Sequence, residues 1–215
     1  MSDTNTLLIN EIFYSIQGES LTTGEPTIFI RLAGCPLRCS YCDTSYAFKD
    51  GEELSFDSIM SKISKYNTSY VTVTGGEPLS QKNCYTFLDL VSSKFLVSLE
   101  TSNAYPIKDV NKNISIVLDV KTPRSNESNN NLELNYNYLK NKDQIKFVIC
   151  DRTDYEWSVD YIQKYKLDEK CKILFSPSYD EMSPTELADL ILSDGLNVRL
   201  QIQLHKLLWG NERGK

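Results

Sequence analysis

Three cysteines within eight residues, Cys35, Cys39 and Cys42, constrain this chain more than any other feature. The spacing C-x3-C-x2-C brings three thiols into one tight loop, which Gly34 and Pro36 help to turn. Three thiolates so close together can hold three irons of a four-iron cluster and leave the fourth iron without a protein ligand. An open metal position is typical of a catalytic site, in which a small molecule completes the coordination.

A structural zinc site is the main alternative. Its fourth ligand would be Cys84, Cys150, Cys171 or the single histidine, His205. Structural zinc sites commonly pair two C-x2-C turns, whereas this chain contains one. The three scattered cysteines have apolar neighbours, so we expect them to be buried free thiols rather than parts of a disulfide framework.

Length and charge narrow the class of protein. The 215 residues are not divided by a Pro-, Gly- or Ser-rich linker, so we expect a single domain over 1–215. The net charge is −6 and no Lys/Arg block is present, which argues against a nucleic-acid or membrane-surface partner. A polar N-terminus without an apolar run, and thiols that suit a reducing compartment, predict a cytoplasmic protein.

Strands and helices alternate along the chain, which predicts an α/β fold with a parallel sheet. After an N-terminal strand, the pattern from Thr27 onward gives six to seven strands and about six helices. We expect the strands at 7–13, 27–32, 70–73, 95–99, 114–118, 144–149, 172–175 and 197–203. The chain is too short for an eightfold barrel, which typically takes about 250 residues, so a partial, open β/α barrel is predicted.

Two helices carry clear start signals. Ser55 can cap a helix whose apolar residues recur at helical spacing, and Ser183-Pro184-Thr185-Glu186 is a capping box with proline at the first helical position. Gly195 can end the second helix. The polar loop at about 124–131 is rich in Asn and Ser and is expected to be mobile.

Polar and glycine-rich runs follow the predicted strands. They are the cysteine loop and the segments 74–78, 100–103, 119–124 and 203–206. Parallel α/β folds bind ligands at the carboxyl ends of their strands. We therefore expect these runs to converge on one site.

The cysteine spacing resembles that of the radical S-adenosylmethionine (SAM) enzymes. In that family the amino and carboxylate groups of SAM chelate the open iron, and an electron from the cluster cleaves the sulfonium. Gly75-Gly76-Glu77-Pro78 is similar to the turn that holds the methionine amino group there, and Glu100-Thr101-Ser102-Asn103 to a Glu-Thr-Asn-Gly run. Ser102 and Asn103 depart from that run, but Asn103 can adopt the left-handed conformation that glycine would supply.

Further stretches resemble one branch of that family, the 7-carboxy-7-deazaguanine synthases. They are Ile16-Gln17-Gly18-Glu19, the run from Phe29 to Cys35, Cys42-Asp43-Thr44 and Gln203-Leu204-His205-Lys206. The resemblance implies a lyase that contracts the ring of 6-carboxy-5,6,7,8-tetrahydropterin with loss of ammonia, on the route to queuosine and other deazapurines. It also implies a 4Fe-4S cluster, SAM, Mg²⁺, an electron donor such as flavodoxin or ferredoxin, and a homodimer.

Site roles follow from the same resemblance. Cys35, Cys39 and Cys42 would hold the cluster and Thr44 the magnesium ion. The cofactor would contact Tyr41, Cys42, Asp43, Gly75, Gly76, Glu77, Glu100, Ser102, Asp119, Val120 and Lys121. The substrate would contact Ile16, Gln17, Gly18, Glu19, Arg31 and Thr74. Asp119-Val120-Lys121 departs from the Ser-Pro-Lys of many relatives, which makes Asp119 and Val120 the least secure contacts.

The residue types leave several alternatives open. The two-pronged guanidinium of Arg31 suits a carboxylate, but an arginine at a strand end can also be a surface ion pair. Thr44 can bind a metal or bond its own loop, and His205 can be a substrate ligand or a structural residue. The rival enzyme class is a glycyl-radical activating enzyme, which shares the cysteine spacing and acts on a protein; the non-enzymatic alternative is the zinc module.

Overall fold

The computed structural model describes residues 5–215, in which strands and helices alternate. The strands are β1 (Thr6–Ile16), β2 (Pro26–Leu32), β3 (Glu52–Ser55), β4 (Tyr70–Gly75), β5 (Leu96–Thr101), β6 (Ser115–Val120), β7 (Gln144–Ile149), β8 (Lys172–Pro177) and β9 (Arg199–Leu200). The α-helices are α1 (Phe56–Ile63), α2 (Asn83–Ser92), α3 (Arg152–Tyr165), α4 (Pro184–Ser193) and α5 (Leu204–Trp209). Short 3₁₀ turns include η1 (Ser45–Phe48), η2 (Pro78–Ser80), η3 (Pro123–Ser125) and η4 (Ser128–Asn130).

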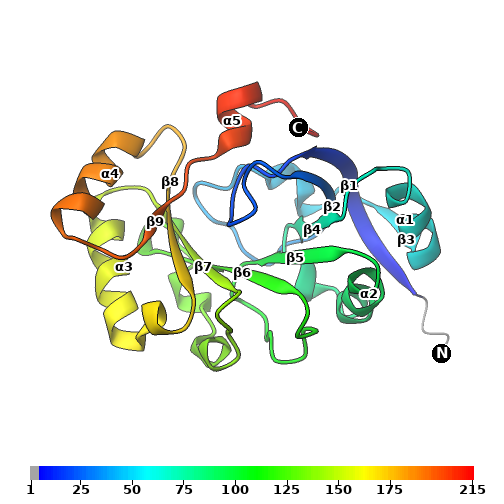
Figure 1. The fold of residues 1–215 in the computed structure, drawn as a ribbon, viewed down its shortest axis with the longest axis horizontal. Coiled ribbons are helices and arrows are strands. Elements are labelled where there is room, and N and C mark those ends of the chain that lie inside the picture. The colour runs from blue at the N-terminus through cyan, green and yellow to red at the C-terminus, as the bar shows by residue number, and fades with distance from the viewer. Residues whose placement is uncertain (1–4) are drawn as a thin grey trace.

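One open sheet contains all the strands, in the order β3-β1-β2-β4-β5-β6-β7-β8-β9 (Figure 1). Every neighbouring pair from β2 to β9 is parallel. The seven-stranded parallel run predicted from Thr27 onward is therefore confirmed, as is the partial, open β/α barrel. Because the strands are parallel, their carboxyl ends meet at one edge of the sheet.

An antiparallel extension precedes the parallel run. Strand β1 pairs with β2 on one side and with β3 on the other, both antiparallel. The register of β1 and β2 shifts between Ile9 and Glu11, so β1 carries a bulge there. Strand β3 was not predicted, since Leu54 is its only apolar residue and a short polar strand at a sheet edge has little sequence pattern.

The predicted helix signals are confirmed at α1 and α4. The Ser55 side chain accepts a hydrogen bond from the Ser58 backbone at 3.1 Å, and Ser183 accepts one from Glu186 at 3.5 Å. Gly195 follows α4 with a φ of 62°, a left-handed conformation that glycine adopts without strain. These helices pack their apolar faces on the sheet, with α1 and α2 near one end of it and α3 and α4 near the other (Figure 1).

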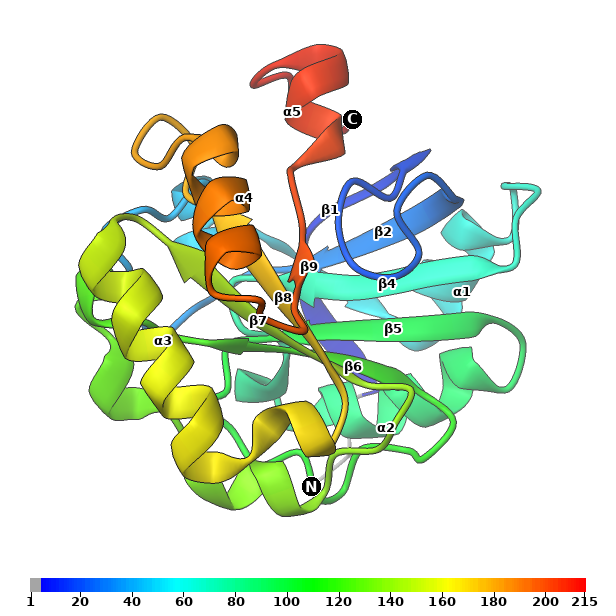
Figure 2. The same ribbon diagram turned by 60° about the vertical axis from the view of Figure 1, so that its left-hand side comes forward.

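Two connections differ from the regular β/α pattern. Neither the segment between β5 and β6 nor the one between β6 and β7 contains an α-helix, so among the described residues the α-helices number five rather than about six. The predicted final strand at 197–203 shrinks to Arg199–Leu200, and the chain then forms α5, which was not predicted. Helix α5 stands beyond the end of β9, apart from the other helices (Figures 1 and 2).

The largest fully buried side chains come from the strands and the sheet-facing sides of the helices, among them Ile28, Phe87, Phe147 and Phe175. Between residues 5 and 215, no helix has both the length and the apolar character needed to cross a membrane.

Candidate active site

A cavity of about 460 Å³ opens at the carboxyl ends of the parallel strands. It brings together nearly all the residues predicted from the sequence. They are Ile16, Gln17, Gly18, Glu19, Arg31, Cys35, Cys39, Tyr41, Cys42, Asp43, Thr44, Thr74, Gly75, Gly76, Glu100, Ser102, Asp119 and Lys121. The expected convergence of strand-end segments is thus present, and two of the predicted residues, Glu77 and Val120, are not among those that line the cavity.

The cysteine loop follows β2 directly, and Cys35, Cys39 and Cys42 all line this cavity. All six cysteines belong to the described part of the chain, where none forms a disulfide; Cys84, Cys150 and Cys171 are buried, as expected. Within the loop the Cys42 amide donates to the Cys39 carbonyl at 3.2 Å. This hydrogen bond closes a tight turn from Cys39 to Cys42 within the loop.

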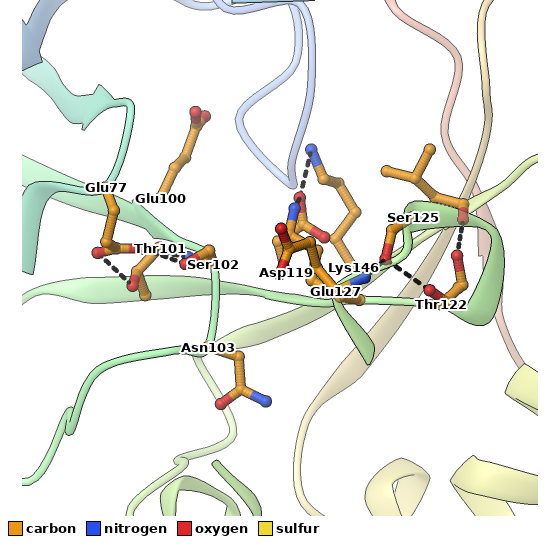
Figure 3. A network of polar contacts seen from close by, with 12 residues as sticks. Glu77, Glu100, Thr101, Ser102, Asn103, Asp119, Thr122, Ser125, Glu127 and Lys146 are labelled. Atoms are coloured by element: carbon orange, nitrogen blue, oxygen red, sulfur yellow. Dashed lines mark hydrogen bonds and ion pairs between the residues drawn. The ribbon is translucent and has the colours of Figure 1, made fainter. Parts of the chain in front are cut away.

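The Asn- and Ser-rich segment after β6, for which we expected mobility, is attached to the cysteine loop. The Ser40 amide donates to the Ser125 carbonyl at 3.2 Å, and the Ser40 hydroxyl donates to the Arg124 carbonyl at 2.6 Å. The Arg38 amide donates to the Glu127 carboxylate at 2.5 Å. Figure 3 shows Ser125 and Glu127 in the polar network of this segment. The segment therefore braces the outer side of the cysteine loop.

A four-iron cluster takes one thiolate on each of three irons, so three cysteines in one loop match its protein ligands in number. Burial raises the pKa of Cys35 and Cys42, and raises that of Cys39 to about 11, so a metal that binds here has to displace the thiol protons.

The glycine turn after β4 lies against the cysteine loop. The Gly76 amide donates to the Leu32 carbonyl at 3.1 Å, and the Glu77 amide donates to the Gly34 carbonyl at 2.8 Å. A Cβ atom on Gly76 would overlap the Gly34 carbonyl and approach Cys35. Only glycine allows this contact, which fits a turn that supports both the cluster loop and a ligand.

Glu77, predicted as a cofactor contact, lies beside the cavity and is not among its lining residues. Its carboxylate is fully buried and accepts four hydrogen bonds, from the Leu79 amide and Thr101 hydroxyl at 2.9 Å and from the amide and hydroxyl of Ser102. Figure 3 shows the side chain directed at Thr101 and Ser102. Glu77 thus shapes the ends of β4 and β5 instead of facing the cavity. Asn103, which follows Ser102, has a φ of 61°, the left-handed conformation predicted for it.

The end of β6 contributes Asp119 and Lys121, whereas Val120 between them points into the core and is fully buried. Strand alternation explains this difference, because successive side chains project to opposite faces. The Lys121 ammonium lies 3.1 Å from Asp119. Asp119 Oδ1 and the Tyr41 hydroxyl are both buried without a hydrogen-bond partner among residues 5–215. Two such atoms beside one cavity fit a site that receives a polar ligand.

Charged side chains of alternating sign lie next to one another along the cavity. The Lys146 ammonium lies 2.8 Å from Glu19 and 3.7 Å from Asp119, which in turn pairs with Lys121. Burial alone would lower the pKa of Lys146, but the charges of Glu19, Asp119 and Glu100 outweigh it and raise that pKa well above its ordinary value. Burial would raise the pKa of Glu19, and Lys146 holds it below its ordinary value instead. Both groups are therefore charged at neutral pH.

Glu100 ends β5 near the predicted substrate residues. Its carboxylate accepts from the Thr74 hydroxyl at 2.8 Å and from the Gln17 amide at 3.5 Å. Figure 3 shows Glu100 and Glu77 turned in different directions. Burial, together with the nearby charge of Glu19, raises the pKa of Glu100. This carboxyl group can thus hold a proton at a higher pH than an ordinary glutamate.

Thr44 donates its hydroxyl hydrogen to Asp43 at 2.8 Å, so in this structure it bonds within its own loop. Asp43 also accepts from Gln203 at 3.3 Å and lies 3.7 Å from the Lys206 ammonium. These contacts attach α5 to the cysteine loop. The adjacent hydroxyl and carboxylate are oxygen donors of the kind that Mg²⁺ prefers.

His205, which the sequence left undecided, lines the cavity. Its imidazole covers Gly18 so closely that a Cβ on Gly18 would overlap Nδ1. Burial lowers the pKa of His205, so the ring is neutral at neutral pH and can both donate and accept a hydrogen bond.

Several cavity residues were not predicted as site residues. The segment Ser176-Pro177-Ser178-Tyr179 ends β8 and could have been found by the strand-end argument used elsewhere. Lys146 lies inside β7, where its only sequence signal is that it is the one charged residue of a mostly apolar strand. Lys215 reaches the cavity from the far end of the described chain, and no local pattern indicates this.

The fold and this site define a radical SAM enzyme. Residues 29–166 match the family model described as the Radical SAM superfamily. The solved structure described as QueE from Escherichia coli superposes with a TM-score of 0.77 at 24% identity and covers 93% of this chain and 95% of that chain, which shows the shared fold.

Two curated relatives specify the family. The 7-carboxy-7-deazaguanine synthase of Chlorobaculum tepidum is 38% identical over 213 residues, 97% of this chain and 97% of that protein. The 7-carboxy-7-deazaguanine synthase of Methanospirillum hungatei is 41% identical over 203 residues, 93% of this chain and 84% of that protein. The chain therefore belongs to the radical SAM superfamily and, within it, to the 7-carboxy-7-deazaguanine synthase family.

Proposed function

We propose that this protein is a radical SAM lyase that contracts the ring of 6-carboxy-5,6,7,8-tetrahydropterin to give 7-carboxy-7-deazaguanine, with loss of ammonia. The observation that carries the proposal is that Cys35, Cys39 and Cys42 line the same cavity as Gln17, Arg31 and Glu100. Near-complete coverage by relatives named 7-carboxy-7-deazaguanine synthase supports the same reaction. The reaction belongs to deazapurine biosynthesis.

The cofactor half of the cavity lies between the cysteine loop and the ends of β4 and β6. Cys35, Cys39 and Cys42 would hold the 4Fe-4S cluster, and the cluster and SAM supply one-electron chemistry that protein side chains lack. SAM would be held between the Gly75-Gly76 turn, Tyr41, Asp43, Ser102, Asp119 and Lys121. The unpartnered oxygens of Tyr41 and Asp119 support this assignment. Glu77 and Val120 would act from behind this wall, since both are buried outside the cavity.

The substrate half is formed by Ile16, Gln17, Gly18, Glu19, Arg31 and Thr74. Arg31 offers a fixed two-pronged donor for the substrate carboxylate. Gln17 and Glu19 present amide and carboxylate groups that match the donors and acceptors of a pterin edge. The hydrogen bonds from Gln17 and Thr74 to Glu100 support a place for Glu100 beside the substrate rather than the cofactor. With its raised pKa, Glu100 can exchange a proton with the bound ring.

Mg²⁺ is proposed to bind at Thr44, with the neighbouring Asp43 carboxylate as a further oxygen donor. The ion would neutralise charge on the substrate carboxylate and orient it. A low-potential electron donor such as flavodoxin or ferredoxin, and a homodimeric assembly, complete the proposal by resemblance to the family. The rival activating enzyme would need a protein substrate. The cation- and carboxylate-lined cavity instead suits a small polar substrate.

The test is anaerobic turnover of 6-carboxytetrahydropterin by reconstituted protein with a reductant, SAM and Mg²⁺, following 7-carboxy-7-deazaguanine. Cys39→Ala should abolish both the cluster absorbance and the product. Cys84→Ala is the matched control, because Cys84 is buried in α2 and the variant should keep the cluster and activity. If SAM is cleaved but no product forms, the substrate assignment is wrong; if Cys84→Ala loses the cluster, the ligand assignment is wrong.

A further inference from the structure

A β-bulge decides which residue faces Arg31. Ile9 of β1 pairs with Leu32 of β2, but the next pair along is Glu11 with Arg31, so Asn10 is one residue extra. If β1 paired regularly, without the bulge, Asn10 would oppose Arg31 and Glu11 would project from the other face of the sheet. The Asn10 side chain is fixed elsewhere, donating to the Asp50 carbonyl at 2.6 Å. The bulge thus re-aims Glu11 at Arg31.

Glu11 and Tyr46 hold the guanidinium of Arg31 from one side. Arg31 Nε donates to Glu11 Oε1 at 2.7 Å, and the Tyr46 hydroxyl donates to the same oxygen at 2.9 Å. The rings of Phe13 and Tyr46 lie 5.8 and 6.0 Å from the guanidinium carbon. These contacts restrict the orientation of the guanidinium, because one edge is bonded and two rings lie close to it.

The other edge of Arg31 is left for a ligand. Arg31 lines the cavity, and within residues 5–215 neither Nη atom has a hydrogen-bond partner. Glu11 and Tyr46 are not among the described residues that line the cavity, and the cavity residue that both contact through the Glu11 carboxylate is Arg31. An arginine that is already oriented loses less conformational entropy when it binds a carboxylate in the two-pronged manner.

We propose that Glu11 and Tyr46 are positioning residues that present the Nη edge of Arg31 to the substrate carboxylate, and that they thereby set the preference for carboxylated pterins. This inference rests on the proposed function. The ion pair with Arg31 and the hydrogen bond from Tyr46 both end on one oxygen of Glu11, so the role requires an acceptor oxygen at that point. A glutamine at position 11 can keep that oxygen, whereas an alanine cannot.

The test compares two probes, 6-carboxypterin and unsubstituted pterin, by anaerobic calorimetry on the reconstituted enzyme with SAM and Mg²⁺. Glu11→Ala should weaken 6-carboxypterin about tenfold and leave pterin nearly unchanged. Glu11→Gln should restore 6-carboxypterin to within about threefold of the parent. Tyr46→Phe should act in the same direction as Glu11→Ala but less strongly. In an Arg31→Ala background, Glu11→Ala should have no further effect on 6-carboxypterin.

The ratio of the two affinities separates positioning from general damage. If Glu11→Ala weakens both probes equally, or neither, the inference is overturned and Glu11 is only a structural partner. If Glu11→Ala does not fold, Glu11→Gln and Tyr46→Phe carry the comparison. Turnover of the parent enzyme distinguishes the two proposals. Absence of product overturns the proposed function, whereas product formation with an unchanged affinity ratio in the variants overturns only this inference.

Discussion

Gly76 packs its α-carbon directly on the carbonyl of Gly34, the residue that precedes Cys35, the first of the three clustered cysteines. The contact joins the turn after β4 to the loop after β2, two neighbouring parallel strands. Position 76 therefore controls the placement of Cys35 as well as the wall against which SAM would lie.

Gly76→Ala should reduce cluster loading, because the new methyl group would push Gly34 and Cys35 away from the turn. We expect iron and sulfide content after reconstitution to fall at least about twofold, with a loss of stability of about 1–3 kcal/mol. Gly195→Ala is the matched control, since its positive φ causes backbone strain with nothing within 4 Å of the new atom. Equal cluster content in the two variants would contradict the expectation.

Glu77→Gln should destabilise the protein without changing a group that faces the cavity. Each carboxylate oxygen of Glu77 accepts two hydrogen bonds, and an amide would direct its NH₂ group at two of those donors. Buried donors left without acceptors cost about 1–3 kcal/mol. Urea unfolding would measure this, with the exposed Glu169→Gln as reference. An unfolding free energy equal to that of the reference would show that Glu77 has no such role.

Lys146→Met should change how the free energy of unfolding depends on pH. In the parent protein Lys146 holds the pKa of Glu19 below its ordinary value of 4.5, so Glu19 stays charged and paired from pH 5 to pH 8. Without the cation, burial dominates and raises the folded-state pKa of Glu19, and that of Glu100 rises further. A raised folded-state pKa gives stability that is lost as pH rises through it.

The stability difference between parent and Lys146→Met should therefore grow from pH 5 to pH 8. Urea unfolding at several pH values measures it, with Lys94→Met, an exposed lysine, as the matched control. A difference that stays constant over this range would refute the assigned role of Lys146.

Glu127→Ala should loosen the brace on the cysteine loop. It removes the 2.5 Å hydrogen bond from the Arg38 amide and a 2.6 Å bond from Asn130. We expect an iron chelator to strip the cluster several-fold faster, with turnover per intact cluster unchanged, because a hydrogen bond of this kind contributes about 1 kcal/mol. Glu169→Ala is the control, and a stripping rate equal to that of the control would count against the brace.

The parts of the fold that follow from local patterns could be predicted. The apolar runs of the parallel strands, the Ser55 and Ser183 caps and the buried face of α2 all depend on residues near one another in sequence. Strand β3, helix α5 and the helix-free connections around β6 were missed. Their sequences are short or mixed in character, so tertiary packing decides their conformation.

By itself the sequence determined the chemistry of the site: three thiols in one loop, a glycine turn and polar residues at successive strand ends. Such features are local, and parallel strands bring their carboxyl ends together without further information. Only the tertiary structure decided which way each side chain points. Val120 points into the core because successive side chains of a strand project to opposite faces. Four hydrogen-bond donors hold the Glu77 carboxylate outside the cavity. One extra residue in β1 placed Glu11 on Arg31, because a shift of one residue moves a strand's side chains to its other face.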